Sequence, residues 1–279
     1  MRLNSFFAVS TGLAALAFAT PAAAQSTDDA PFTGFYVSAS AGVDLQQNDV
    51  GESILFDRNL DGRFGDVLTT TTGVNAFSTG FCNGQGRGVT STTGTGCAND
   101  SNTVSYSVRG GYDRQYGNFV IGLVGEVGRS EIRDSVTAFS ITPANYVMNR
   151  EIDFSANVRL RVGYAANKTL FYATSGGAYA RVNNTFTTTN TVNTFTNNGN
   201  TNAFGFIAGG GIEQKISPHV SIGVEYLYTN LKDDDYRVRV AGGPATSPFT
   251  LGGAGGTDFL RSSDSFRYSS LRANISYRF

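Results

Sequence analysis

The chain has 279 residues, of which 40% are hydrophobic, 12% aromatic and 15% charged, and it contains 34 Gly, 2 Cys and no Trp. Its 21 Lys and Arg residues nearly balance its 22 Asp and Glu residues, which excludes a basic nucleic-acid-binding surface as a property of the whole chain. His219 is the only histidine, so the composition also argues against histidine-based metal sites and acid–base catalysis.

The first 24 residues carry the features of an export signal. Arg2 supplies a positive charge, residues 6–19 form an apolar run, and Ala22-Ala23-Ala24 offers a small-residue cleavage site. The run is too short for a transmembrane helix, which needs about 20 apolar residues. We therefore expect residues 1–24 to be a cleaved signal peptide, residues 25–32 a short N-terminal segment, and residues 33–279 one folded domain.

Apolar and polar residues alternate with a period of two in the body of the chain. In residues 34–45, the side chains of Phe35, Val37 and Ala39 fall on one face, and small or polar side chains fall on the other. Such alternation predicts β-strands with one face of each kind. The pattern predicts eight strands, at about residues 34–45, 103–113, 118–130, 151–164, 169–182, 203–214, 219–231 and 265–279.

The connections between these strands alternate in length. Short turns at residues 114–117, 165–168 and 216–218 contain Gly, Asn or Pro. Far longer segments join the other pairs, at residues 46–102, 131–150, 183–202 and 232–264. Short turns at one end and long loops at the other are typical of outer-membrane barrels. The sequence therefore predicts an all-β fold: an eight-stranded antiparallel up-and-down transmembrane β-barrel with long extracellular loops and short periplasmic turns.

One face of the predicted strands is apolar and the other carries charged residues. A soluble β-sandwich would turn the apolar face inward, whereas a transmembrane barrel turns it to the lipid. The export signal, the alternation and the loop asymmetry together favour the membrane barrel. Eight strands enclose space only for side chains, so Arg and Glu would fill the lumen as hydrogen-bonded pairs. The residues assigned to this lumen network are Arg109, Glu126, Arg159, Arg161, Glu213, Glu225, Arg272 and Arg278.

Two cysteines, Cys82 and Cys97, lie in the first long loop. In an exported protein, two cysteines in one loop indicate a disulfide. The alternative is a redox-active pair, but the sequence places no activating neighbour beside either thiol.

The same loop contains Asp57-Arg58-Asn59-Leu60-Asp61-Gly62, which matches the first half of a calcium-binding loop. Asp57, Asn59 and Asp61 would supply oxygen ligands, but position 12 of the motif is Leu68 rather than Glu, and Asp66 could replace it only in part. The alternative is an Asx-rich turn, in which these side chains accept hydrogen bonds from their own backbone. Calcium is therefore the one possible cofactor.

The third long loop has a biased composition. Between residues 183 and 202, sixteen of the twenty residues are Asn or Thr. Thr favours strands and Asn favours turns, so the segment predicts either a polar hairpin that extends the barrel or a mobile surface loop. Such a surface could bind a receptor, a phage or a host cell, or it could simply be solvated.

Several segments carry a family resemblance. They are residues 106–113 (YSVRGGYD), 117–122 (GNFVIG), 209–213 (GGGIE) and 224–228 (VEYLY). With them, the chain resembles the small eight-stranded bacterial outer-membrane barrels that include the transmembrane domain of OmpA, the opacity proteins and the porin-family surface proteins of alphaproteobacteria. The resemblance implies a place in the outer membrane of a Gram-negative cell, in contact with its lipids.

The C-terminal residues resemble a signal found in the same family. Tyr277 and Phe279 lie on one face of the last predicted strand, and Phe279 ends the sequence. This resembles the terminal-Phe signal that the barrel-insertion machinery reads, and it implies that machinery and periplasmic chaperones as partners. One departure is the absence of Trp, which leaves Phe and Tyr to form the aromatic girdles.

The function expected from these features is structural rather than enzymatic. His219 falls in a short periplasmic turn, where it could not serve as a catalytic base near the outer rim. We expect a role in envelope integrity and surface contact or adhesion, with a surface ligand or a phage or host receptor as a possible partner. The alternative is a narrow porin-like diffusion channel for small solutes.

Overall fold

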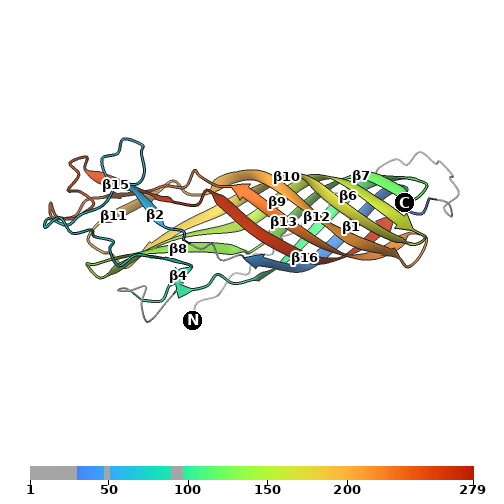
Figure 1. Ribbon diagram of the computed structural model, residues 1–279, viewed down its shortest axis with the longest axis horizontal. Helices are drawn as coiled ribbons and strands as arrows, with labels where there is room; N and C mark the ends of the chain where they lie inside the picture. Colours follow the sequence, from blue (N-terminus) through green and yellow to red (C-terminus); the bar gives the residue numbers. More distant parts are fainter. Residues whose placement is uncertain (1–29, 47–50, 89–96) are drawn as a thin grey trace, which may run out of the picture.

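The protein is described by a computed structural model over residues 30–46, 51–88 and 97–279. The expected signal peptide, residues 1–24, lies outside the described residues. Figure 1 shows a closed barrel at one end and a second group of shorter strands at the other. The barrel strands are β1 (Gly34–Gln46), β6 (Thr103–Tyr116), β7 (Phe119–Ser130), β9 (Ala144–Ala166), β10 (Thr169–Thr188), β12 (Thr201–Lys215), β13 (Val220–Lys232) and β16 (Ser265–Arg278).

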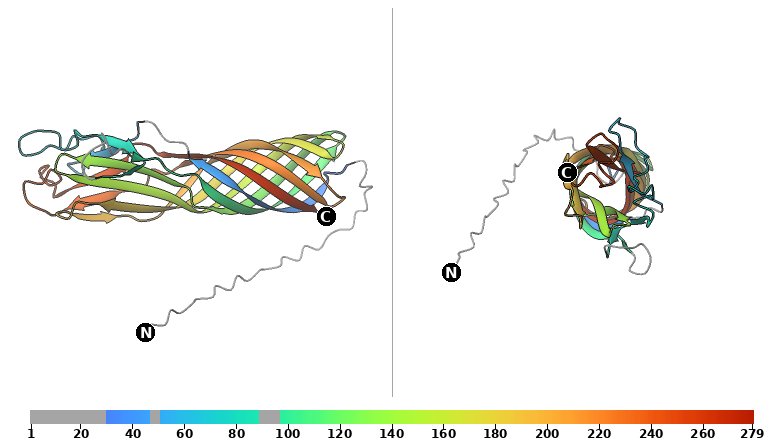
Figure 2. Two further views of the ribbon diagram at one scale, coloured as in Figure 1. Left: turned by 90° about the horizontal axis from the view of Figure 1, so that it is seen from below. Right: turned by 90° about the vertical axis from the view of Figure 1, so that its left-hand side faces the viewer.

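Each barrel strand pairs antiparallel with the next, and β1 closes the ring by pairing with β16. The view down the long axis in Figure 2 shows this ring. The predicted eight-stranded antiparallel barrel is therefore confirmed. No helix in the described part of the chain is long and apolar enough to cross a membrane.

The apolar face of the barrel points outward. Exposed and half-buried aromatic side chains form two belts around it. The belt at the short-turn end contains Tyr116, Phe119, Tyr164, Phe171, Tyr277 and Phe279, and the other contains Tyr106, Phe154, Tyr179 and Phe204. Ten residues separate Phe154 from Tyr164 on β9, which for a tilted strand is a height of about 25 Å and matches the apolar band of an outer-membrane barrel.

Two strands continue far beyond the second belt. β9 runs on to Ala144 and β10 to Thr188, so the prediction of a loop over all of 131–150 was wrong. Of the two alternatives for the third loop, the structure has the hairpin extension of the barrel. The register of β9 and β10 shifts between Arg181 and Val182, and this β-bulge marks where the extension begins.

The extension and the long loops form a compact head. Its strands are β2 (Ile54–Asp57), β3 (Phe81–Asn83), β4 (Gln85–Gly86), β5 (Cys97–Ala98), β8 (Arg133–Ser140), β11 (Thr194–Asn197), β14 (Val238–Ala241) and β15 (Gly256–Arg261). A four-stranded sheet, β11-β14-β15-β2, faces the barrel extension formed by β8, β9 and β10. Between the two layers lies an apolar core that includes Phe56, Phe77, Tyr146, Phe249 and Phe259.

Candidate functional site

The middle of the barrel lumen contains a set of mutually paired charges. Arg109 donates to Glu225 at 2.9 Å, and Arg159 donates to both Glu126 (2.8 Å) and Glu225 (3.1 Å). Arg272 completes the set with a 2.7 Å bond to Glu126. Each of the two carboxylates is thus held by at least two guanidinium groups. All five side chains are buried, and a buried charge is stable only when it is paired in this way.

A second set lies closer to the short-turn end. Arg161 donates to Asp113 at 3.1 Å and also to Glu213, and Arg278 donates to Asp113 at 2.9 Å. The Arg161 guanidinium stacks 3.8 Å from the ring centroid of Tyr172. Planar stacking and forked hydrogen bonds are available to Arg and not to Lys, which accounts for an arginine in this position.

Glycines on the inward face make room for these large groups. A Cβ at Gly122 would lie 1.9 Å from an Asp113 carboxylate oxygen, and a Cβ at Gly211 would lie 2.7 Å from the Tyr172 hydroxyl. The large side chains therefore fit into the lumen only because small residues stand beside them on the neighbouring strands.

Apolar layers close both ends of this charged section. At the short-turn end, Phe32 is fully buried and packs with Val120, Ala165, Leu170 and Tyr172. Its carbonyl accepts a 2.7 Å bond from Arg278. Toward the head, a second apolar layer is formed by Ile132, Ile152, Ala180, Val182, Ala203, Leu231, Phe266 and Tyr268.

A third set of charges lies above that layer, where the barrel meets the head. Arg261 makes two 2.7 Å bonds to Glu52 and one of 3.0 Å to Asp134, and Arg150 bonds Asp134 at 2.6 Å. Burial raises the pKa of the Glu52 carboxyl. Burial also acts to raise the pKa of Asp134, but Arg261 and Arg150 outweigh it and hold that pKa below its ordinary value.

β9 passes through every one of these layers in order. From the short-turn end it contributes Ala165, Arg161, Arg159, Ile152 and Arg150. It then contributes Tyr146 to the aromatic core of the head. The lumen is thus a stack of charged and apolar layers rather than one polar tube.

All eight residues of the predicted lumen network lie in the two lower charged sets. Asp44 and Asp113 also face the lumen and were not among the predicted residues, although both continue the inward alternation of their strands, which was a usable signal. Four charged residues of the third set were not predicted either: Glu52, Asp134, Arg150 and Arg261. Glu52 and Arg261 are 209 residues apart, and no periodic pattern relates them.

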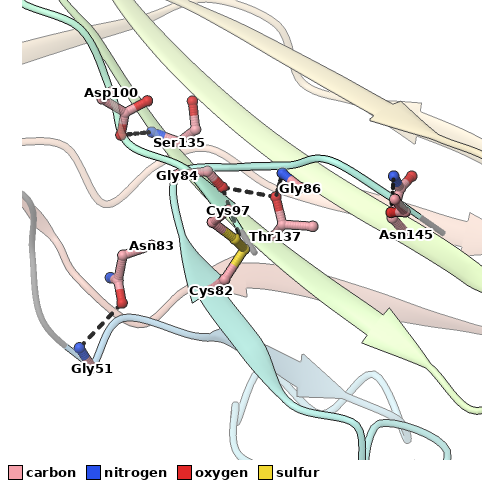
Figure 3. The surroundings of a disulfide bond; sticks show 11 residues. Gly51, Cys82, Asn83, Gly84, Gly86, Cys97, Asp100, Ser135, Thr137 and Asn145 are labelled. Atoms are coloured by element: carbon pink, nitrogen blue, oxygen red, sulfur yellow. Dashed lines mark hydrogen bonds between the residues drawn. A yellow bond between two sulfur atoms is a disulfide. The ribbon is translucent and has the colours of Figure 1, made fainter. Parts of the chain in front are cut away.

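The predicted disulfide joins Cys82 of β3 to Cys97 of β5 (Figure 3). Loop 1 is also hydrogen-bonded to the outer face of β8. Thr137 donates to the Gly84 carbonyl at 2.8 Å, and the Ser135 amide donates to Asp100 at 3.0 Å. The disulfide therefore stabilises a loop layer that lies against the outside of the barrel extension.

The residues of the calcium motif form a network of local hydrogen bonds. Asp57 is buried and accepts bonds from the amides of Asp61 (3.2 Å) and Gly62 (2.8 Å), and Asp66 accepts one from the Arg58 amide (2.8 Å). Asn59 accepts a bond from the Asp61 amide at 3.3 Å. These are the bonds of the Asx-rich alternative. In the described parts of the chain, no group of three or more His, Cys, Asp or Glu residues is arranged to hold a metal ion; calcium binding stays a prediction.

The remaining predicted residues lie at the short-turn end. Tyr277 and Phe279 point outward and contact each other, with ring centroids 5.3 Å apart. The Phe279 amide donates to the Phe35 carbonyl at 2.9 Å, which ties the last residue to β1. His219 lies in the turn before β13, where its Nδ1 is 2.9 Å from the Arg278 carbonyl oxygen.

Comparison with known sequences agrees with this architecture. The OmpA-like transmembrane domain matches residues 73–279, which include every barrel strand except β1. The "22 kDa outer membrane protein" of Rhizobium leguminosarum bv. viciae is 29% identical over 126 residues, which are 45% of this chain and 52% of the relative. The chain thus spans about half the length of that curated relative.

Two solved outer-membrane proteins align with most of this chain at low identity. The outer membrane protein OprG from Pseudomonas aeruginosa is 11% identical, with a TM-score of 0.47 and coverage of 88% of this chain and 96% of that one. The outer membrane protease OmpT from Escherichia coli is also 11% identical, with a TM-score of 0.40 and coverage of 90% and 98%. With the closed barrel, the outward apolar belt and the domain match over residues 73–279, the chain belongs to the family of outer-membrane proteins built on the OmpA-like transmembrane domain.

Proposed function

We propose that this protein is a non-conducting barrel with a structural and surface-exposed role in the outer membrane. The observation that carries the proposal is the filled lumen, in which charged layers alternate with apolar layers. A hydrated ion would have to cross both apolar layers and displace paired arginines, and each step costs several kcal/mol.

The charges of the lumen balance within each lower layer. Arg109, Arg159 and Arg272 face Asp44, Glu126 and Glu225, and Arg161 and Arg278 face Asp113 and Glu213. A selective pore needs an excess of one charge along its path to attract its ion. Balanced pairs instead favour a structural filling that holds the eight strands together.

Single-channel recording of the refolded mature protein, residues 25–279, in a planar bilayer tests this proposal. We expect no steps across a range of voltages. Steady steps with cation or anion selectivity would overturn it and support a porin.

A double variant makes the test sharper. Replacing Arg159 and Arg161 together by Ala removes the two guanidinium groups that bridge opposite sides of the lumen, so conductance should rise. The matched control replaces Arg129 and Arg181, which point outward, and it should remain silent. Unchanged conductance in a correctly folded lumen variant would contradict the filled-lumen account.

One observation favours the alternative, a narrow diffusion channel. Asn274, Ser40 and Ser107 face the lumen in one row across β16, β1 and β6. Their side chains are buried, and the Ser40 and Ser107 hydroxyls and the Asn274 amide have no hydrogen-bond partner among the described residues. Buried polar atoms of this kind are ordinarily satisfied by ordered water. This wall is where a water path would run if the barrel conducts.

The proposed partners follow from the location. Outer-membrane lipids would contact the apolar belt, and the insertion machinery and periplasmic chaperones would handle the chain during assembly. A surface ligand, or a phage or host receptor, would meet the head. We infer no enzymatic activity, since the one histidine is bonded to the backbone at the short-turn end.

A further inference from the structure

A polar groove lies on the outside of the head, just above the second aromatic belt. Its volume is about 670 Å³. One wall is the loop 1 segment 98–103, and the floor is the outer face of β8, β9 and β10. The groove is separate from the barrel lumen, because its floor residues alternate with the inward ones.

The floor consists of two parallel rows of polar side chains. Arg133, Glu151 and Asn183 are register partners in one row. The next row contains Ser135, Asn149 and Thr185. The three strands therefore present a flat surface of amide, hydroxyl, carboxylate and guanidinium groups. Such a surface offers both donors and acceptors at the spacing of a β-sheet.

The wall of the groove is fixed in place. Cys97, next to the segment, is bonded to Cys82, and Asp100 accepts a hydrogen bond from the Ser135 amide (Figure 3). Asn102 accepts a 3.1 Å bond from the Gln46 amide at the end of β1. A wall held at three points does not have to be ordered when a ligand binds, which favours affinity.

The chemistry of the lining restricts the ligand. Asp100, Glu131 and Glu151 outnumber Arg133, which already pairs with Glu151 at 2.7 Å, so an anionic ligand would be repelled. Ala98 is the one apolar side chain among the described residues of the lining, which disfavours a hydrophobic ligand. The Asn149 side-chain oxygen is buried and has no hydrogen-bond partner in the described structure, so the floor contains one unsatisfied acceptor.

We propose that this groove is a binding site for a neutral saccharide. Sugar hydroxyls both donate and accept, and they match the mixed floor better than a phosphate, an acyl chain or a metal ion does. Glu151 is three residues above Phe154 on β9, which places the groove about 8 Å above the aromatic belt for a tilted strand. At this height the saccharide is either the sugar portion of an outer-leaflet glycolipid or a glycan from outside the cell. The site goes beyond the structural role proposed above and does not depend on whether the lumen conducts.

The binding test uses the mature protein in phosphatidylcholine nanodiscs, with the side-chain amides of Asn149 and Asn183 followed by NMR. Two neutral probes separate the sources: the hexose and heptose oligosaccharide of a rough lipopolysaccharide, freed of phosphate and of the acidic Kdo sugar, and an N-acetyllactosamine tetramer. A dextran sulfate oligomer is the anionic control. We expect a neutral probe to shift both amide signals and dextran sulfate to leave them unchanged. The first probe would identify the leaflet glycolipid as the source, and the second an external glycan.

Variants locate the binding. Asn149→Ala with Asn183→Ala removes hydrogen bonds from the floor and should weaken binding about tenfold. Because this variant lacks the two side-chain amides, its binding is followed through the backbone amides of Glu151 and Thr185. Asn200→Ala, an exposed asparagine outside the groove, is the matched control and should bind as the parent does. Glu151→Gln, which keeps the shape of the floor, serves if the double variant does not fold. Failure of both neutral probes to bind, tighter binding of dextran sulfate, or parental affinity in the folded floor variants would each overturn the proposal.

Discussion

The barrel and the head are built with opposite interiors. The barrel encloses paired charges such as Arg159 and Glu126 and turns Val158 and Leu160 outward. The head encloses aromatic residues and turns Asn and Thr outward. β9 and β10 run through both regions, so a single strand follows both patterns. The surrounding medium, lipid or water, therefore decides which face of a strand is apolar, while the backbone geometry stays the same.

Breaking a charge pair in the barrel should have the largest effect. Arg159→Leu leaves Glu126 and Glu225 each short of a partner in a buried site, and we expect a loss of about 3–5 kcal/mol in the free energy of unfolding. Urea unfolding in lipid vesicles measures it. Arg129→Ala is the control: its pair with Asp153 is about half exposed on both sides, so the loss should stay below about 1 kcal/mol. Equal losses in the two variants would contradict the assignment of the lumen pairs as structural.

Removing an aromatic side chain from the head should cost about as much, but locally. Phe259 is fully buried and contacts Phe56, Tyr146 and Phe249, so Phe259→Ala should destabilise the head by about 3–5 kcal/mol. Limited proteolysis should then cut the head while the barrel keeps its folded, heat-modifiable gel mobility. Loss of the barrel in the same transition would show that the two regions unfold as one unit.

The barrel was predictable from sequence because lipid imposes a strict rule on it. Every strand crossing the membrane must show an apolar face to lipid, and this produced the alternation that located all eight strands within a few residues, apart from the extensions of β9 and β10. The same alternation of apolar and polar residues predicted that Arg109 and Arg159 point into the lumen. Between the two belts, the charged side chains of the barrel strands lie on the face opposite the aromatic residues, as a water-free exterior demands.

The head was not predictable in the same way. β8 is buried on both faces beyond Arg133, since the core covers one side and loop 1 the other, and its sequence alternates only from Ser135 to Ala138, a run too short to indicate a strand. The core residues Phe77 and Phe249 come from two different loops and Tyr146 from the upper part of β9, and the three share no spacing. Only the closed barrel brings these loops together, and sequence periodicity carries no information on contacts of that range.

Breaking the disulfide should have a smaller effect on stability, and this effect should be confined to the head. The bond closes a ring with a sequence separation of 15, which by chain entropy corresponds to about 3 kcal/mol. Cys82→Ser with Cys97→Ser should loosen the layer on the outside of β8, seen as faster amide exchange at Ser135 and Gly86. Exchange in β1 and β16 should not change. Faster exchange there would mean that the loop layer also supports the barrel.

The smallest expected effect is a pH dependence confined to the wall of the groove. Burial raises the pKa of Asp100 to about 6, against the opposing hydrogen bond from Ser135. Because the folded state favours the protonated acid, its contribution to stability is complete below about pH 4 and is lost as the pH rises to about 6. Amide exchange at Ser135 should therefore quicken between pH 4 and pH 7, after correction for the intrinsic pH dependence of exchange. Asp100→Asn keeps the acceptor and removes the charge, so its corrected exchange should stay level across this range. If the variant shows the same pH profile as the parent, Asp100 is not the group that causes the pH dependence. The dependence would then be assigned to Glu52, because burial raises the pKa of that carboxyl as well.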